Sequence, residues 1–162
     1  MALTKVQGEG ISGVSISANN EITMSSQPAF NAYADVQNNI AVGSDVTVEF
    51  ANERFDNNGD FSTPNFTAPV TGKYQFNVSI YLNTVDTASA YYYVELSTSN
   101  EQYYNIFDST ELTSDAAYWG LTLSHVVDMD ANDTARIDVQ QANGTSQTDI
   151  NANSFFSGHL VC

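Results

Sequence analysis

The sequence contains one cysteine and has no long apolar run. The single Cys162 excludes an internal disulfide framework, so stability must come from the core and from partner subunits. We interpret Cys162 as a small apolar residue that ends the last strand, not as a nucleophile. No apolar stretch approaches the ~20 residues of a membrane span, and the first residues lack the basic and apolar regions of a signal peptide. We therefore expect a soluble, unprocessed protein without a membrane span.

Basic residues are also scarce. The 162 residues include four Lys and Arg against nineteen Asp and Glu, which gives a formal net charge of −15. Such a chain repels the phosphate backbone, which excludes nucleic acid as a partner. The length fits one domain with a short appendage, and it is long enough to bury a self-sufficient core.

Catalytic motifs are missing as well. The chain has no Gly-X-Ser-X-Gly elbow, no His-Glu-X-X-His and no phosphate-binding glycine loop. Its two histidines, His125 and His159, each stand alone in a predicted strand, and we place His125 on the apolar face of its strand. Two carboxylates could hydrolyse a glycoside, but no pair among the nineteen acidic residues is singled out. We expect a protein that is not an enzyme.

The sequence does contain many segments in which apolar and polar residues alternate. Residues 74–82 alternate most regularly, as half-buried antiparallel strands do. Further strands are predicted at 46–50, 119–127 and 137–139 by alternation, and at 91–96 and 103–107 by aromatic content. Clusters of Asn, Asp, Gly, Ser and Thr separate these segments, and no window has helical spacing. The pattern favours an all-β sandwich, jelly roll or barrel.

Residues 1–27 differ from the rest, so we divide the chain into an N-terminal arm, 1–27, and a head, 28–162. Four apolar residues of the arm flank a polar turn at 18–21 and predict one small hairpin, which buries too little surface to fold alone. We interpret the arm as an attachment segment held by neighbouring subunits or by a larger assembly. The apolar residues are Val14, Ile16, Ile22 and Met24.

Several motifs of the head carry a resemblance to a known family. Ala29-Phe30 opens the head, a polar turn lies at 55–61, residues 69–76 read PVTGKYQF, an acidic turn lies at 130–134, and residues 155–160 read FFSGHL. In this order the motifs resemble the globular heads of complement component one-q, which share their fold with tumour necrosis factor, over about residues 28–162. One departure is Asn132-Asp133, where the family usually has Gly-Asp. The resemblance implies an antiparallel two-sheet jelly roll and a homotrimer.

The resemblance also suggests roles for individual residues. Consecutive tyrosines in a strand point to opposite faces, so one set belongs in the core, and we assign the outward set to a subunit interface before a glycan site. The predicted interface or core residues are Phe30, Phe61, Tyr74, Phe76, Tyr91, Tyr93, Phe155 and Phe156. Relatives often bind calcium near the apex of the trimer, which makes Asp128, Asp130 and Asp133 candidate ligands. Their loop lacks the Gly and Glu of the helical calcium motif, and the alternative is a solvated turn. Asp56, Asn58 and Asp60 form a second cluster of this kind.

The opening Met-Ala-Leu-Thr-Lys-Val, the Gly/Ser/Asn-rich arm and the absence of a collagen stem resemble structural proteins of marine and cyanobacterial bacteriophages. We therefore expect a homotrimeric head on the virion surface, a capsid decoration (cement) or head-fibre protein, whose arm binds other virion proteins. The alternative is the tip of a tail fibre, whose apical loops bind a host receptor or cell-surface glycan. The two hypotheses differ in whether the arm or the apical loops carry the specific contact.

Overall fold

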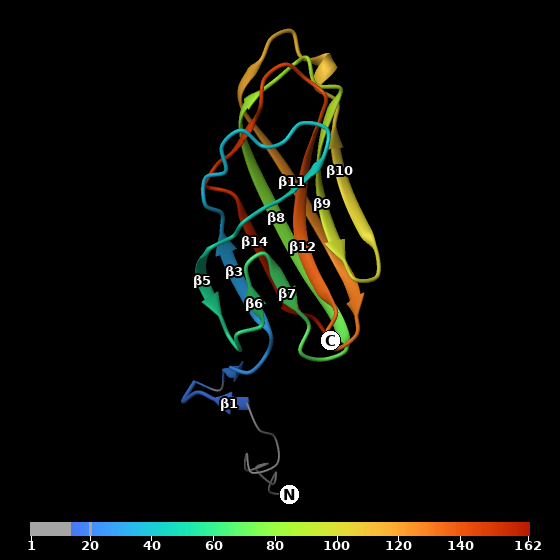
Figure 1. Ribbon diagram of the computed structural model, residues 1–162. Coiled ribbons are helices and arrows are strands. Elements are labelled where there is room, and N and C mark those ends of the chain that lie inside the picture. Colours follow the sequence, from blue (N-terminus) through green and yellow to red (C-terminus); the bar gives the residue numbers. More distant parts are fainter. Residues whose placement is uncertain (1–13, 20) are drawn as a thin grey trace, which may run out of the picture.

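The computed structural model describes residues 14–19 and 21–162, which form two antiparallel sheets packed face to face, with a small hairpin below them (Figure 1). The first sheet has the order β11-β8-β14-β3-β5, with β13 added to β8. Its strands are β11 (Ala116–Met129), β8 (Gly72–Val85), β14 (Phe155–Leu160), β3 (Ala29–Tyr33), β5 (Asn52–Asp56) and β13 (Asp149–Ile150). The predicted two-sheet jelly roll is confirmed.

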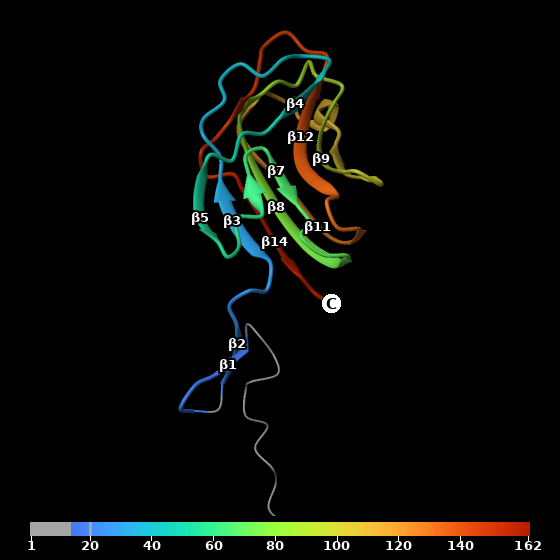
Figure 2. The ribbon, with the colours of Figure 1, turned by 60° about the horizontal axis from the view of Figure 1, so that its bottom comes forward.

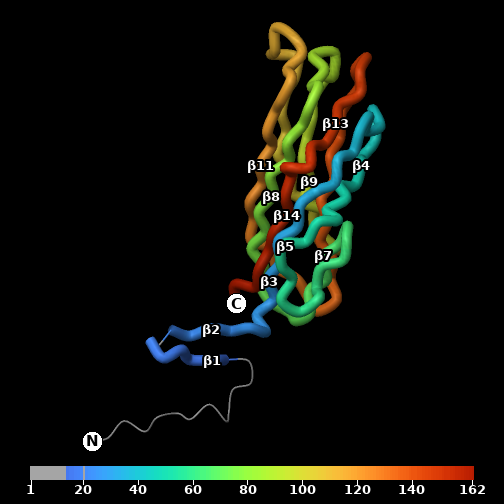
Figure 3. Tube along the Cα trace, turned by 90° about the vertical axis from the view of Figure 1, so that its left-hand side faces the viewer, coloured from blue at the N-terminus to red at the C-terminus, as the bar shows by residue number. Residues whose placement is uncertain are grey.

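The second sheet has the order β10-β9-β12-β7-β6, with β4 added to β12. Its strands are β10 (Gln102–Phe107), β9 (Tyr91–Thr98), β12 (Thr134–Ala142), β7 (Asn65–Thr67), β6 (Phe61–Ser62) and β4 (Asp45–Thr47). Between β10 and β11 lies one short 3₁₀ turn, η1 (Ser109–Glu111). The edge view in Figure 3 shows that one end of the molecule, the base, carries the C-terminus and the hairpin, while long loops form the opposite end, the apex.

The closing strand β14 lies inside the first sheet, where it pairs with β3 on one side and β8 on the other. Phe156 is fully buried, and its ring lies 4.9 Å from that of Phe30, edge to face. A Cβ on Gly158 would lie 2.6 Å from a ring carbon of Phe76 and 2.8 Å from one of Phe30. The glycine of the FFSGHL ending is therefore required because two aromatic rings lie directly on its backbone.

A similar constraint explains the PVTGKYQF segment. A Cβ on Gly72 would lie 2.6 Å from the carbonyl oxygen of Cys162 and 2.7 Å from the side chain of Leu160. Two residues later the buried Tyr74 donates its hydroxyl proton to the carbonyl of Val70 at 2.7 Å. The motif thus joins the start of β8 to the end of the chain.

Two expectations are corrected by the structure. The strand predicted at 46–50 is only Asp45–Thr47; Val48 and Phe50 remain buried but continue as irregular chain, because the backbone leaves β12 there and crosses toward the first sheet. His125 faces the same side of β11 as Leu123, as predicted, but it is exposed and not buried, and its ring lies 4.0 Å from that of Tyr103 on the edge strand β10.

Candidate functional site

The outer face of the first sheet, called here the first-sheet face, is polar at its centre. Strand register aligns Asn31, Ser157, Asn77 and Ser124 in one row across four strands. Gln75 Nε2 donates to Ser124 Oγ at 2.9 Å, and Ser124 Oγ donates to Asn77 Oδ1 at 2.9 Å. Short side chains held in place by one another leave a level surface that a second protein can approach closely.

One polar atom of this face has no partner. The Oδ1 atom of Asn31 is buried and receives no hydrogen bond from the described residues. A buried acceptor without a donor costs about 1–3 kcal/mol, and few occur in a folded protein. The row therefore contains one buried acceptor whose cost is not offset by a donor among the described residues.

Aromatic side chains lie around the polar centre. Phe155 packs against Tyr33 with ring centroids 6.0 Å apart, and the guanidinium of Arg54 lies 4.7 Å above the Tyr33 ring. Toward the apex, Tyr81 and Tyr118 are 5.6 Å apart, and Tyr118 is 63% exposed. Aromatic residues and arginine are the side chains enriched in protein interfaces, so this face has the composition of a contact surface.

The structure divides the eight residues predicted for the interface or core into three groups. Five lie in the core between the sheets: Phe30, Phe61, Tyr74, Phe76 and Phe156. Phe155 lies on the first-sheet face. Tyr91 and Tyr93 lie on the outer face of the second sheet, on the other side of the molecule from Phe155.

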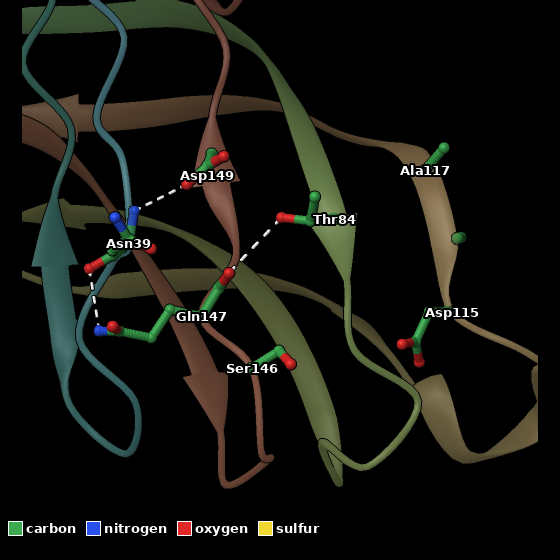
Figure 4. A pocket seen from close by; sticks show the side chains of 8 residues that line it. Asn39, Thr84, Asp115, Ala117, Ser146, Gln147 and Asp149 are labelled. Atoms are coloured by element: carbon green, nitrogen blue, oxygen red, sulfur yellow. Dashed lines mark hydrogen bonds between the residues drawn. The ribbon is translucent and has the colours of Figure 1, made fainter.

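The apex contains a pocket of about 680 Å³ (Figure 4). Asp149 Oδ1 accepts a hydrogen bond from the backbone amide of Asn39 at 2.7 Å, and Gln147 Nε2 donates to the carbonyl of Asn39 at 3.0 Å. Asp115 Oδ1 accepts from the amide of Thr87 at 2.9 Å. The lining residues are Asn39, Thr84, Asp115, Ala116, Ala117, Ser146, Gln147 and Asp149.

The backbone of this pocket is unusual at two positions. Asn39 has a φ of 56° and Thr84 a φ of 55°, both in the left-handed region. A β-branched residue rarely adopts this conformation, because its Cβ crowds the backbone. The surrounding hydrogen bonds therefore hold the pocket in a defined shape.

A buried carboxylate that sequence reasoning did not single out fixes the apical loops. Asp86 is 2% exposed and accepts hydrogen bonds from the backbone amides of Ala88, Thr145 and Ser146. Burial alone would raise the pKa of Asp86, but these amides, led by that of Ser146, outweigh it and hold the pKa below the usual value. The only feature of the sequence that points to this role of Asp86 is its position directly after an alternating strand, where an Asp side chain can bind the backbone of a turn.

The candidate calcium ligands lie at the base and not at the apex, Asp128 near the end of β11 and Asp130 and Asp133 in the turn that follows it. Asp133 Oδ2 already accepts from Asn100 Nδ2 at 2.7 Å and from the amide of Asp130 at 2.8 Å. Asp128 lies 3.9 Å from the ammonium of Lys73. In residues 14–19 and 21–162, no three His, Cys, Asp or Glu side chains are placed together to hold a metal ion.

The second acidic cluster has a structural role in its turn. Asp56 Oδ1 accepts from the amides of Gly59 and Asp60, both at 3.1 Å, and Asp56 Oδ2 accepts from that of Phe61 at 2.9 Å. Asn58 Nδ2 donates to Asp60 Oδ2 at 3.3 Å. These groups close the turn between β5 and β6.

At the base, β1 (Val14–Ile16) pairs with β2 (Ile22–Met24) in the hairpin that the arm sequence predicted. The register places all four apolar side chains on one face, and Ile16, Ile22 and Met24 are 53–68% exposed. Gln27 Nε2 donates to the carbonyl of Leu160 at 2.6 Å, which joins the segment after the hairpin to the head. A groove of about 520 Å³, lined partly by Met24 and Val161, separates hairpin and head. Residues 1–13 of the predicted arm lie outside the described residues.

In the described part of the chain, no helix is long and apolar enough to span a membrane.

A family model described as the C1q domain matches residues 29–161. Among solved structures, the globular domain of zebrafish complement 1qA is 19% identical with a TM-score of 0.58, covering 84% of this chain and 98% of its own. Murine APRIL is 10% identical with a TM-score of 0.61, covering 83% and 99%. A search of curated proteins found no match.

Proposed function

The chain belongs to the C1q domain family, and we propose that it is a non-enzymatic, homotrimeric head on the surface of a bacteriophage virion, anchored by its N-terminal arm. Domains of this family are typically non-enzymatic, trimeric binding modules that act outside the cell. The observation that supports assembly best is the first-sheet face, where a row of polar residues is flanked by aromatic side chains that include the exposed Tyr118.

The hairpin supports the anchoring role. Its apolar face is not covered by the described part of the chain, and two strands with exposed apolar side chains are marginally stable in water. Hydrogen bonds from Gln27 and Asn58 to neighbouring backbone hold the segment between hairpin and head. The hairpin therefore projects from the base as a separate contact element, as the turned view in Figure 2 shows. We propose that other virion proteins, of the capsid or the tail, cover it.

Two measurements test this function. Light scattering of the purified protein at micromolar concentration should give the mass of a trimer. Deletion of residues 1–25 should leave a folded trimer that no longer joins particles of the virus that encodes the chain, with occupancy measured by quantitative mass spectrometry of purified virions. A monomer would contradict assembly through the first-sheet face, and normal occupancy of the truncated protein would contradict anchoring by the arm.

A second candidate function is the receptor- or glycan-binding tip of a tail fibre. The apical pocket favours it, because amide, hydroxyl and carboxylate groups converge in a preformed hollow at the end opposite the arm. Binding of host-cell glycans on an array, lost in Asp149→Ala and retained after deletion of residues 1–25, would support this alternative over a purely structural head.

A further inference from the structure

The outer face of the second sheet carries an ordered grid of tyrosines and carboxylates, called here the tyrosine–carboxylate face. Figure 2 shows β4, β12 and β9 side by side, and β10 pairs with β9 at the edge. Strand register places these side chains in two adjacent rows. One row is Tyr104, Glu95, Asp138 and Thr47; the other is Ile106, Tyr93, Gln140 and Asp45.

The carboxylates of this face are crowded. Glu95 and Asp138 lie directly opposite each other on neighbouring strands and are 2% and 3% exposed. Like charges in this position destabilise a sheet. The negative charge of Asp138 is compensated by Arg136, whose Nε lies 2.9 Å from Asp138 Oδ2. The hydroxyl of Thr47 also donates a hydrogen bond to Asp138 Oδ1 at 2.6 Å. Asp45 accepts hydrogen bonds from the hydroxyl of Tyr93 and from Gln140 Nε2.

Glu95 has no cationic partner. The ion pairs within residues 14–19 and 21–162 are Lys73 with Asp128 and Arg136 with Asp138, and neither includes Glu95. The side chains of Tyr104 and Ser97 lower the pKa of Glu95, but both are neutral and supply no counter-charge. A nearly buried carboxylate beside two others is therefore left without a counter-charge on an otherwise exposed face.

Exposed aromatic side chains adjoin this carboxylate and form an independent feature of the face. Tyr91 is 38% exposed and Tyr104 47%, and Ile106 at the edge is 62% exposed. Tyr93 stacks on Tyr91 with centroids 6.2 Å apart and meets Tyr104 edge to face at 5.3 Å. These contacts hold the rings in fixed orientations. Contiguous exposed apolar surface on a polar protein marks an interaction site.

We propose that the tyrosine–carboxylate face binds a basic peptide segment of a partner protein, with a Lys or Arg side chain placed over the rings of Tyr93 and Tyr104 and beside the carboxylates of Glu95 and Asp45. A cation would supply the missing counter-charge and would lie over tyrosine rings, where cation–π attraction adds to it. A neutral glycan would use the rings but would leave the carboxylates uncompensated. The face lies on the sheet opposite the first-sheet face, so the proposal does not depend on how the head assembles.

The proposal predicts how binding depends on pH. Burial, followed by the charges of Asp138 and Asp45, raises the pKa of Glu95 above its usual value. A cation binds the ionised form, so affinity should fall as the pH is lowered through the folded-state pKa of Glu95. The titratable and charged groups that face Glu95 are Tyr93 on β9, Tyr104 on β10, Arg136 and Asp138 on β12, and Asp45 on β4.

The test uses the full-length protein and a blocked tetra-arginine peptide as the probe. Calorimetry in 150 mM salt measures affinity, and NMR shifts of the tyrosine rings locate binding. Glu95→Gln should weaken binding about tenfold or more, the scale of one charge pair at an interface. The matched control is Glu53→Gln, which removes the same charge from an exposed position on β5 of the other sheet and should change affinity less than about twofold, since distant surface charges are screened.

Two further variants keep the test decisive. Asp45→Asn, at the exposed edge of the grid, should also weaken binding, and it replaces Glu95→Gln if that variant does not fold. Tyr104→Leu should lower affinity while the charge is unchanged. Equal affinity loss in Glu95→Gln and Glu53→Gln, or shifts located on other residues, would overturn the proposal. So would maltoheptaose shifting the same tyrosines equally in wild type and Glu95→Gln, because the face would then recognise sugar.

Discussion

At the scale of single residues, neighbours in sequence occupy different environments. Phe156 is fully buried among Phe30, Phe61 and Phe76, whereas Phe155 points outward to the first-sheet face beside Tyr33. Period-two alternation places adjacent residues on opposite sides of the sheet, but the sequence does not reveal which side is buried.

Phe156→Ala should lower the free energy of unfolding by roughly 3–5 kcal/mol, because it opens a cavity among packed rings. Phe155→Ala should change the stability of one subunit much less and should instead weaken the trimer. Urea denaturation followed by tryptophan fluorescence measures the first effect, and light scattering over a dilution series measures the second. Equal unfolding free energies for both variants would contradict the placement of these rings.

Glu95 provides a second prediction at this scale, on stability against pH. Its folded-state pKa is raised, so folding is disfavoured while the side chain is ionised and gains stability as the pH falls through that pKa toward the unfolded value. The melting temperature should therefore rise as the pH is lowered through the folded-state pKa of Glu95. In Glu95→Gln the rise should shrink, and the variant should be more stable than wild type at pH 7.5. A steeper rise in the variant would show that other groups control the effect.

At the scale of elements, the sequence predicts where the strands lie better than it predicts which strands pair with one another. Alternation located β8, β11 and β12, because each has one face in the core along its length. It overextended β4, because Val48 and Phe50 are buried without being paired in a strand. The family motifs predicted the order of elements, and the described structure gives their physical reason at Gly72 and Gly158.

The positions of outward side chains could not be predicted in the same way. Which surface Tyr91 and Tyr93 face depends on the pairing of β9 with β12, which is distant in sequence. Glu95 and Asp138 are 43 residues apart and become neighbours only through that register. The apical role of Asp86 likewise depends on amides near residue 145 that no local pattern connects to it.

Asp86 gives a prediction for the apical loops. Asp86→Ala removes an acceptor of three backbone amides and should lower the free energy of unfolding by about 2–3 kcal/mol, since hydrogen bonds to a charged group are the stronger kind. Hydrogen exchange should accelerate at the amides of Thr145 and Ser146 but not in β8. Because the pKa of Asp86 is lowered, its contribution should persist at neutral pH and disappear as the pH falls through the folded-state value. Unchanged exchange at both amides would contradict this role.

At the scale of the whole molecule, charge opposes assembly. A trimer brings together three chains that each carry −15, and the described residues pair few of these charges. Self-repulsion of this size is screened over about 8–10 Å at physiological salt. The acidic turn after β11 lies at the base, the same end of the molecule as the arm and the C-terminus, so negative charge from three copies could gather there.

Calcium binding at this turn stays a prediction, and assembly changes how it should be tested. In the described residues no three acidic side chains are grouped to hold a metal ion, so an ion at this turn would also use backbone oxygens, water or ligands from other subunits. Removing calcium with EGTA at fixed ionic strength should then lower the melting temperature of the trimer and promote its dissociation. Asp128→Asn combined with Asp130→Asn should remove the response to calcium, while Glu53→Gln serves as a charge control at a distant position. A melting temperature that follows total ionic strength alone would show that calcium acts only by screening and that this turn is a solvated loop.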